Sequence, residues 1–306
     1  MMRLTLGLAL ACALTAAAAQ AEPARPPITG ISHIAVYTAD VTASDDYYGR
    51  ILGARKAPDP EDAHGVRYYF SPQQFVEVLP LGPNPGLSRL AHVAWNTTDA
   101  AGLRTYLIAH GQPGVSALRK AADGGLWFET QDPEGNGVQF VQPASADARA
   151  EPGAISGRII HVGYMVRSRA AEDKFYRDLL GFRPYWHGAM KAGSTDWISQ
   201  QVPDGHDWLE YMMVGDGSTT PLDRVDAREL GVLNHFSLGV PNMEVAVTTL
   251  ISGNRQSPRH DGPSMGLDGK WQANLYDPDG TRAELMEFKP VTKPCCSDFT
   301  ADSPER

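Results

Sequence analysis

Cysteine and positive charge are both scarce in this sequence. Its 306 residues include three cysteines: Cys12 lies in an apolar N-terminal stretch, and Cys295 and Cys296 are adjacent near the C-terminus. An adjacent pair can be surface thiols or a vicinal disulfide, but it provides no disulfide framework, so an apolar core must stabilise the fold. Lysine and arginine number 27 against 36 aspartates and glutamates, for a formal charge of −9. Because no basic cluster interrupts this balance, a nucleic-acid-binding surface is not expected.

Only one apolar segment is long, and it has the features of a signal peptide. Arg3 is followed by an almost wholly apolar run over residues 4–18 and by an A-x-A motif at residues 19–21. The run is shorter than the roughly 20 residues that a membrane-spanning helix needs. We therefore expect cleavage after Ala21, a periplasmic or secreted location, and no membrane association of the mature chain.

A histidine followed by a distant acid or amide recurs four times. The pairs are His33 with Glu77, His92 with Gln139, His161 with Glu210, and His235 with Glu284. Their separations run from 44 to 49 residues. Recurrence at a nearly fixed spacing indicates that one supersecondary unit has been copied.

The elements predicted around the first and third histidines have the same order. Residues 31–36 are typical of a strand, and residues 40–52 are typical of a helix that stops at Gly53. The same order recurs 128 residues later, over residues 159–181. This agreement indicates an internal duplication.

The second and fourth units match each other in the same way. Residues 90–111 and 233–253 each contain a predicted strand, a helix and a glycine stop. Later Asp-Pro-x-Gly turns, at residues 132–135 and 277–280, are expected to join adjacent strands.

The predicted fold class is α+β, with four βαβββ modules in two paired-module halves built on curved, mixed sheets. We expect a first double domain over residues 28–143, a linker rich in Ala, Pro and Gly over 144–157, and a second double domain over 158–288. Residues 289–306 are polar and are expected to form a disordered tail.

This arrangement resembles the vicinal oxygen chelate superfamily, which includes glyoxalase I, extradiol dioxygenases and the bleomycin-resistance proteins. The helix ends at residues 47–53 and 175–182 and the Asp-Pro-x-Gly turns carry the resemblance, which covers residues 28–288. It implies that paired modules form a cup around one divalent metal ion, and that the first and last strands of both modules supply its ligands. Because this fold hosts many chemistries, the resemblance does not name one.

The resemblance implies two possible sets of ligands. With sequential pairing, the second half supplies His161, Glu210, His235 and Glu284, and the first half supplies His33, Glu77, His92 and Gln139. With crosswise pairing, the sets are His33, Glu77, His235, Glu284 and His161, Glu210, His92, Gln139. The sequence does not choose between these pairings.

A single strand histidine is more often a hydrogen-bonded core residue than a ligand. Here the histidines recur at equivalent points among apolar neighbours, where an unpaired ionisable group would be costly. A mixed set of imidazoles and carboxylates suits Zn, Ni, Co, Mn or Fe(II). Gln139 replaces a carboxylate in the first half, although its amide oxygen can still ligate a metal.

Other residues of the second half are weaker candidates. His187 and His206 lie in loops, where a solvated histidine is the ordinary outcome. Four aromatic residues could line a pocket for a ring-bearing substrate, and core packing explains them equally well: Trp197, Trp208, Tyr211 and Trp271.

The first functional hypothesis is an exported metal-dependent isomerase, epimerase or lyase of glyoxalase type, acting as a monomer or homodimer on a small oxygenated molecule. In it the metal is a Lewis acid that chelates two neighbouring substrate oxygens, and Glu284 or Glu210 is the general base. Glutathione thioesters are a cytosolic chemistry, so an exported enzyme is expected to use another substrate.

The second hypothesis is an Fe(II) extradiol dioxygenase with the triad His161, His235 and Glu284. Two departures count against it: Glu210 replaces the histidine of the dioxygenase pattern, and Asn274 replaces its tyrosine. Simple catechols are therefore not expected to be cleaved. The third hypothesis, a metal-free binding protein of bleomycin-resistance type, is disfavoured because such proteins usually lack the ligand quartet.

Overall fold

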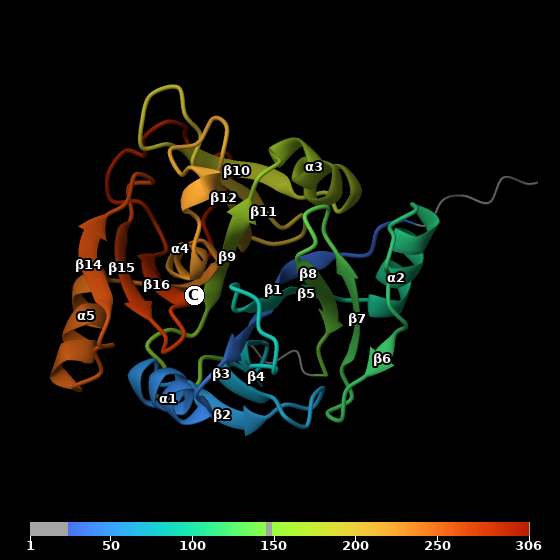
Figure 1. Ribbon diagram of the computed structural model, residues 1–306, viewed down its shortest axis with the longest axis horizontal. Coiled ribbons are helices and arrows are strands. Elements are labelled where there is room, and N and C mark those ends of the chain that lie inside the picture. Colours follow the sequence, from blue (N-terminus) through green and yellow to red (C-terminus); the bar gives the residue numbers. More distant parts are fainter. Residues whose placement is uncertain (1–23, 145–148, 306) are drawn as a thin grey trace, which may run out of the picture.

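The structure contains two eight-stranded sheets, one from each half of the chain (Figure 1). It is a computed structural model that describes residues 24–144 and 149–305, so the predicted signal peptide over residues 1–21 lies outside the described part. The strand order is β2-β3-β4-β1-β5-β8-β7-β6 in one sheet and β10-β11-β12-β9-β13-β16-β15-β14 in the other. The second order is the same as the first with eight added to each strand number. The prediction of four βαβββ modules in two paired halves is confirmed.

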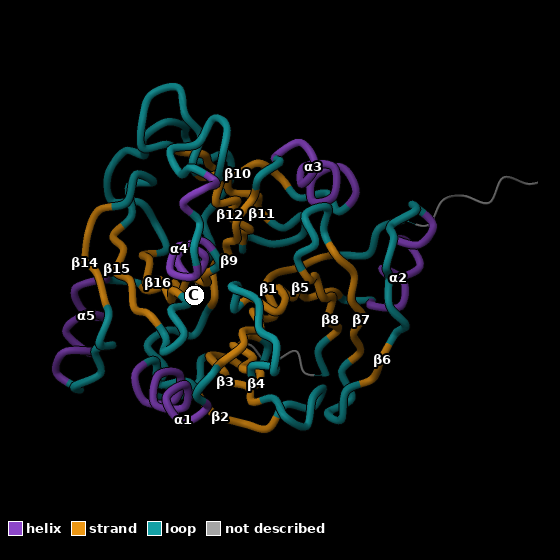
Figure 2. Tube along the Cα trace, viewed as in Figure 1, coloured by secondary structure: helices purple, strands orange, loops and turns teal. Residues whose placement is uncertain are grey.

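Strands form the two curved sheets, and α1, α2, α3 and α5 lie at the periphery (Figure 2). The strands are β1 Ile28–Thr38, β2 Arg55–Pro58, β3 Val66–Ser71, β4 Gln74–Pro80, β5 Leu90–Thr97, β6 Arg119–Lys120, β7 Leu126–Gln131, β8 Gly137–Gln142, β9 Ile159–Val166, β10 Arg183–Gly188, β11 Trp197–Gln201, β12 Trp208–Met213, β13 His235–Val240, β14 His260–Met265, β15 Trp271–Tyr276 and β16 Arg282–Glu287. The helices are α1 Val41–Asp45, α2 Ala100–Ala109, α3 Arg169–Asp173, α4 Ala227–Leu233 and α5 Met243–Ser252, with the π-helical turns η1 Asp46–Ile51 and η2 Lys174–Leu179 and the 3-10 turn η3 Leu222–Arg224. None of the helices in the described part of the chain is both long and apolar enough to cross a membrane.

The first strand of every module lies near the middle of its sheet. β1 pairs antiparallel with β5, and β9 pairs antiparallel with β13. Each of these strands also pairs parallel with the last strand of its own module, namely β4, β8, β12 or β16. In this register, each candidate ligand on a last strand lies opposite a first-strand residue that comes two positions after the histidine of the same module. Glu284, for example, lies opposite Ser237, two residues after His235. Because residues two apart share a sheet face, histidine and acid face the same side. Because β1 pairs with β5 and β9 pairs with β13, the first module pairs with the second and the third with the fourth. This pairing excludes the crosswise ligand sets.

Side-chain caps and glycines fix the ends of the module helices. Asp40 accepts a backbone N–H from the first turn of α1, and Ser168 does the same for α3. Both helices continue into a π-helical turn and end at a glycine with positive φ, Gly53 at 73° and Gly181 at 80°. Glycine adopts this conformation without strain because it has no Cβ.

The two halves pack by placing a helix of one against a turn of the other (Figure 1). The Tyr48 hydroxyl in η1 donates to Asp277 in the last turn of the second half at 2.8 Å. In the opposite direction, the backbone N–H of Arg167, just before α3, donates to Glu134 in the last turn of the first half at 2.7 Å. The Asp-Pro-x-Gly turns therefore hold the halves together as well as joining strands.

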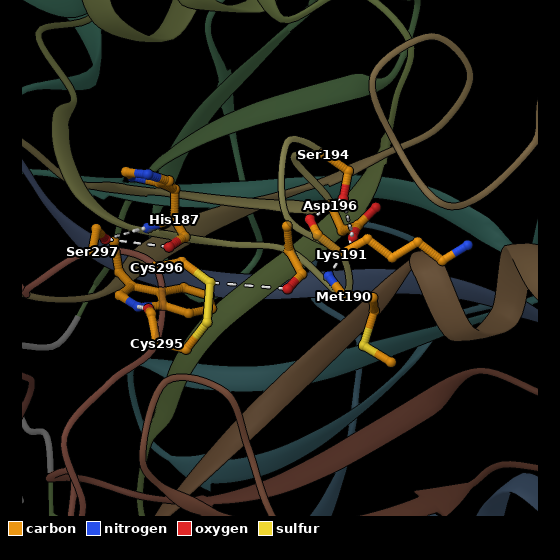
Figure 3. Close-up of a disulfide and its surroundings, with 10 residues drawn as sticks. His187, Met190, Lys191, Ser194, Asp196, Cys295, Cys296 and Ser297 are labelled. Atoms are coloured by element: carbon orange, nitrogen blue, oxygen red, sulfur yellow. Dashed lines mark hydrogen bonds between the residues drawn. A yellow bond between two sulfur atoms is a disulfide. The ribbon is translucent and has the colours of Figure 1, made fainter.

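The segment after β16 packs against the second half and is not the disordered tail that its composition suggested. Its Phe299 ring lies 4.8 Å from that of Tyr185 in β10, centroid to centroid, and the hydroxyls of Ser303 and Tyr185 are 2.7 Å apart. Cys295 and Cys296 form a vicinal disulfide in this segment, beside the end of β10 (Figure 3). The composition of the segment did not show these contacts because they depend on partners that are distant in sequence.

Candidate metal centres

The second half brings four predicted ligands together at the centre of its sheet. His161 in β9, His235 in β13 and Glu284 in β16 each offer a ligand atom, and these atoms all lie within 4.8 Å of one another. The two Nε2 atoms are 3.0 Å apart, and His161 Nε2 is 3.2 Å from the nearer Glu284 oxygen. Glu210 in β12 stands beside this triad, with an oxygen 3.6 Å from His235 Nε2.

The hydrogen bonding of the two imidazoles fits a bound cation. His235 Nδ1 lies 2.9 Å from the Leu233 carbonyl, which can only accept, so neutral His235 presents a lone pair at Nε2. That lone pair faces His161 Nε2, whereas the buried Nδ1 of His161 has no partner within the described residues. Donors about 2.1 Å from one ion and at right angles lie about 3 Å apart. The 3.0 Å spacing is that of a hydrogen bond between the two rings, and it is also the spacing of two donors around one divalent ion.

Burial keeps both imidazoles neutral, and the pKa values of the two glutamates differ. Burial lowers the pKa of His161, and it lowers that of His235 well below its usual value, so both rings are free to ligate at neutral pH. Burial, together with repulsion from Glu284, raises the pKa of Glu210 to about 8. Burial alone would raise the pKa of Glu284 as well, but the hydrogen bond with His161 and the charge of Arg282 bring it below the usual value.

A small aromatic cavity opens beside the second-half triad. Its volume is about 220 Å³, and both glutamates, Glu210 and Glu284, line it. Five aromatic side chains form much of its wall: Tyr185, Trp186, Trp197, Trp208 and Phe299. The Trp208 ring also packs on His161, 4.7 Å between centroids.

The weaker candidates of the second half divide between this cavity and the rest of the molecule. Trp197 and Trp208 line the cavity as predicted. Tyr211 instead belongs to the apolar core, and Trp271 is 38% exposed. The loop histidines His187 and His206 are exposed and are not members of the triad.

The first half brings its own predicted ligands together in the equivalent place. His33 in β1, Glu77 in β4 and His92 in β5 form a triad within the same 4.8 Å limit. The two Nε2 atoms are 2.9 Å apart, and His92 Nε2 is 3.5 Å from a Glu77 oxygen. Gln139 in β8 donates its amide N–H to Glu61 at 2.8 Å, while its buried Oε1 has no hydrogen-bond partner in the described ranges. The hydrogen bond to Glu61 fixes the amide group of Gln139 and leaves its Oε1 available, as a fourth metal ligand would require.

An arginine distinguishes the first-half centre from the second. Buried Arg67 pairs with Asp59 at 2.8 Å and with Glu61 at 2.6 Å, and it lies 3.9 Å from Glu77. Burial and the charge of Arg67 lower the pKa of His92 to about 4. This network was missed from the sequence, where its signal is a charged residue at position 67 of the otherwise apolar and aromatic strand VRYYF.

The cavity at the first-half centre is larger and more polar. It measures about 480 Å³, and Glu77, His92 and Gln139 line it together with Arg119 and Glu129. A still larger cavity, about 880 Å³, lies elsewhere, between the halves and beside the linker, and no predicted ligand lines it. We place the chemistry at the triads rather than in this cavity, because among residues 24–144 and 149–305 the triads are the groups that bring metal-ligating side chains together.

Comparison with known proteins finds similarity of fold to solved structures. No protein-family model and no curated protein sequence matches the chain. Among solved structures it is similar to homoprotocatechuate 2,3-dioxygenase from Brevibacterium fuscum in complex with 3,4-dihydroxyphenylacetate, with 17% identity and a TM-score of 0.63 over 92% of this chain and 84% of that one. The 2,3-dioxygenase LapB from Pseudomonas sp. KL28 gives 15% identity and a TM-score of 0.62 over 89% and 99% of the two chains. A catechol 2,3-dioxygenase gives 17% identity and 0.59 over 89% and 96%.

The chain has the vicinal oxygen chelate fold. At these sequence identities, the comparisons show a similarity of fold. Each half of this chain contains one triad suited to a divalent metal ion.

Around the second triad of this vicinal oxygen chelate fold lie Asn274, which the sequence analysis singled out, and further polar groups that it missed. Arg282 Nη1 lies 3.9 Å from Glu284, and Asn274 lies directly opposite Glu284 in the sheet register. The Asn274 side-chain oxygen and the Lys270 ammonium are both buried without a hydrogen-bond partner in the part of the chain that the structure describes. Sequence position alone gave no signal for Lys270, because its burial depends on distant aromatic residues.

Proposed function

We propose that the second-half centre binds Fe(II) and that the protein is an extradiol-type dioxygenase that opens a small aromatic ring. The observation that carries this proposal is the triad of His161, His235 and Glu284 beside an aromatic cavity. Two histidines and one carboxylate with open positions are the usual donor set of non-haem Fe(II) oxygenases. The dioxygenases of similar fold support the assignment, and one of them holds 3,4-dihydroxyphenylacetate. The predicted signal peptide supports the further proposal that the enzyme is exported.

The position of Glu210 reverses the order of the hypotheses drawn from the sequence. The isomerase came first there, and the dioxygenase came second because Glu210 and Asn274 both depart from its pattern. In the structure Glu210 stands outside the group formed by the other three residues. A three-residue donor set leaves more open positions for substrate and oxygen than a four-residue set does.

The residues around the triad have separate tasks in ring opening. The metal, when bound, supplies Lewis-acid activation of two neighbouring substrate oxygens and one-electron chemistry with O₂. The aromatic wall holds the ring of the substrate and excludes water from the site. Glu210 lines the cavity 3.6 Å from His235. Its pKa of about 8 leaves the carboxyl mainly protonated at neutral pH, so it takes a proton from a substrate hydroxyl only in its ionised form, whose share grows as the pH rises towards 8.

A second candidate is proton transfer by a glyoxalase-type isomerase or lyase. The observation in its favour is that two glutamates, Glu210 and Glu284, line one small cavity, so that one can ligate while the other moves a proton. Asn274, in place of a tyrosine, favours the same candidate. Nickel, cobalt or zinc in the purified protein and no need for oxygen would distinguish it from the dioxygenase.

Oxygen uptake tests the proposed function directly. Anaerobically reconstituted Fe(II) protein is mixed with catechol or 3,4-dihydroxyphenylacetate in air-saturated buffer, and an oxygen electrode follows the reaction. We expect one O₂ consumed per ring-opened product, and no uptake by the His235→Ala variant, which lacks a ligand. Conversion of neither diol by an iron-replete protein would reject ring cleavage in favour of proton transfer.

A further inference from the structure

The vicinal disulfide of Cys295 and Cys296 has no part in the chemistry proposed above (Figure 3). Two adjacent cysteines pair by closing a small ring that includes the peptide bond between them. The stabilisation that a disulfide gives to a fold grows with the length of the loop that it closes. Because this bridge closes no loop beyond its own ring, stabilisation of the fold is a poor explanation for it.

Both polar groups of the Cys295 backbone bind residues of the second-half cavity wall. Its N–H donates to the Leu267 carbonyl at 2.7 Å, and its carbonyl accepts from Trp186 Nε1 at 3.2 Å. Leu267 and Trp186 both line the cavity. Two wall residues are therefore one hydrogen bond away from the bridged pair.

The residues that follow the bridge attach the segment to β10. Ser297 Oγ accepts from the His187 N–H at 3.0 Å, and the Thr300 N–H donates to the Tyr185 carbonyl at 3.0 Å. Between these two attachments lies Phe299, whose side chain forms part of the cavity wall. The position of Phe299 therefore depends on the direction in which the chain leaves the bridge.

The backbone of Cys296 has an unusual conformation. Its φ is 74°, and among the described residues Cys296 and Asn254 are the two residues other than glycine with positive φ. Side chains with a Cβ disfavour this region, although asparagine tolerates it better than most. A closed disulfide ring restricts the backbone of Cys296, whereas two free thiols leave it able to return to negative φ. That return changes the direction of the chain towards Phe299.

The bridge is accessible to a reductant. Cys296 is exposed, and Cys295 is half-buried. The third cysteine of the chain, Cys12, lies in the predicted signal peptide, so the mature chain has no further thiol to exchange with the pair. Thiol–disulfide exchange at this bridge therefore needs a thiol from another molecule.

We propose that Cys295 and Cys296 form a redox latch: their disulfide holds the C-terminal segment, and Phe299 with it, against the second-half cavity, and a dithiol releases it. One thiolate of the dithiol attacks Cys296 Sγ and breaks the bridge, which leaves a mixed disulfide and a Cys295 thiolate. The second thiolate of the dithiol then displaces Cys296. The two cysteines gain two electrons and take up the two protons that the dithiol loses, and the dithiol becomes a disulfide. This latch goes beyond the proposed function, because it needs no reaction at the metal.

Alkylation and hydrogen exchange test the latch on the mature, chelator-treated protein. Mass spectrometry after iodoacetamide treatment should find no modified cysteine before reduction with dithiothreitol, and both cysteines modified after it. In the reduced protein the amides of residues 295–300 should exchange at least about tenfold faster, because the N–H groups of Cys295 and Thr300 lose their acceptors. Strand β7 of the first half is the internal control and should exchange equally in both states.

A variant without the bridge gives an independent measurement. Cys295→Ser combined with Cys296→Ser removes the bridge without a reductant, so Fe(II) stays in place during anaerobic calorimetry. We expect this double variant to bind catechol about 2- to 10-fold more weakly than the oxidised wild type, because Phe299 leaves the cavity wall. Its residues 295–300 should exchange as fast as those of the reduced wild type, and dithiothreitol should change them no further. Asp298→Asn, at an exposed position of the same segment, keeps the bridge and should follow the wild type.

Several outcomes would overturn the latch. One is alkylation of both cysteines in protein that was never reduced, and another is a bridge that dithiothreitol does not reduce in the folded protein. Unchanged exchange at residues 295–300 after complete reduction would reject the latch as well, and so would a double variant that binds catechol as tightly as the wild type. Because alkylation and exchange need no substrate, a protein that binds no catechol but shows the exchange response would reject the dioxygenase and leave the release of the segment intact.

Discussion

Two glutamates of the second centre differ in their distance from the histidines, and this difference assigns their roles. Glu284 belongs to the triad, whereas Glu210 approaches only His235. We predict that Glu284→Gln lowers iron retention at least tenfold, because it removes the single charged ligand. Glu210→Gln should keep the iron and lose about 10²- to 10⁴-fold in turnover, the usual contribution of a general base. Metal analysis and oxygen uptake on the same preparations check both.

The same pair of variants can contradict this assignment. If Glu210→Gln loses metal as completely as Glu284→Gln, the centre has four protein ligands. The isomerase then returns to first place. Glu129→Gln, an acid of the first-half cavity, is the control and should change neither readout at the second centre.

Glu172 in α3 is a buried acid whose ionisation opposes folding. Neither of its carboxyl oxygens has a hydrogen-bond partner among the described residues. Burial, with repulsion from Asp132 and Glu134, raises its pKa to about 9. The contribution of Glu172 to stability is therefore most favourable below its unfolded pKa of about 4.3, and it is lost as the pH rises through the folded value.

Glu172→Gln should remove this loss of stability. We predict a higher melting temperature than the wild type at pH 8 and little difference at pH 4, measured by thermal unfolding. Glu244→Gln on the exposed face of α5 is the control and should follow the wild type at both pH values. A Glu172→Gln variant that is less stable at pH 8 would show that the buried carboxyl contributes a favourable contact.

At the scale of elements, local sequence signals predicted where helices begin and end. The cap at Asp40 and the glycine stops at Gly53 and Gly181 were readable because each satisfies a helix end with nearby atoms. All eight ligand candidates lie on strands, as the recurring spacing between each histidine and its acid or amide predicted.

Other elements depend on distant partners and were not predictable from local patterns. The segment after residue 288 has no periodic pattern, and Tyr185 and Trp186 in β10 hold it. Helix α4 is a seven-residue insertion that has no counterpart in the first half. The pairing of Arg67 with Asp59 depends in the same way on tertiary contact.

The C-terminal segment contributes Phe299 to the second cavity, and this contribution can be measured. Phe299→Ala should weaken catechol binding about 2- to 10-fold, because it removes one aromatic contact to the ring. Val291→Ala, at a 57% exposed position of the same segment, should leave binding unchanged. Equal binding by Phe299→Ala and the wild type would mean that the ring only packs on Tyr185.

At the scale of the whole molecule, duplication has preserved two triads while their surroundings have diverged. The second centre opens onto a small aromatic cavity, and the first opens onto a larger polar one. We predict two divalent ions per chain in protein reconstituted without chelator, and one ion in either His92→Ala or His235→Ala. Elemental analysis against protein concentration gives the count. A single ion that only His235→Ala removes would mean that the ion pairs of Arg67 replace a metal in the first half.

One iron held by His161, His235 and Glu284 is the basis of the proposed chemistry. An anomalous difference map shows this iron most directly when it is recorded at the iron absorption edge from crystals reconstituted anaerobically with Fe(II). We predict a peak about 2.0–2.2 Å from His161 Nε2, His235 Nε2 and a Glu284 oxygen, distances typical of first-row ions. No peak at this triad in iron-replete crystals, or a peak at the first-half triad alone, would show that the iron has been assigned to the wrong place.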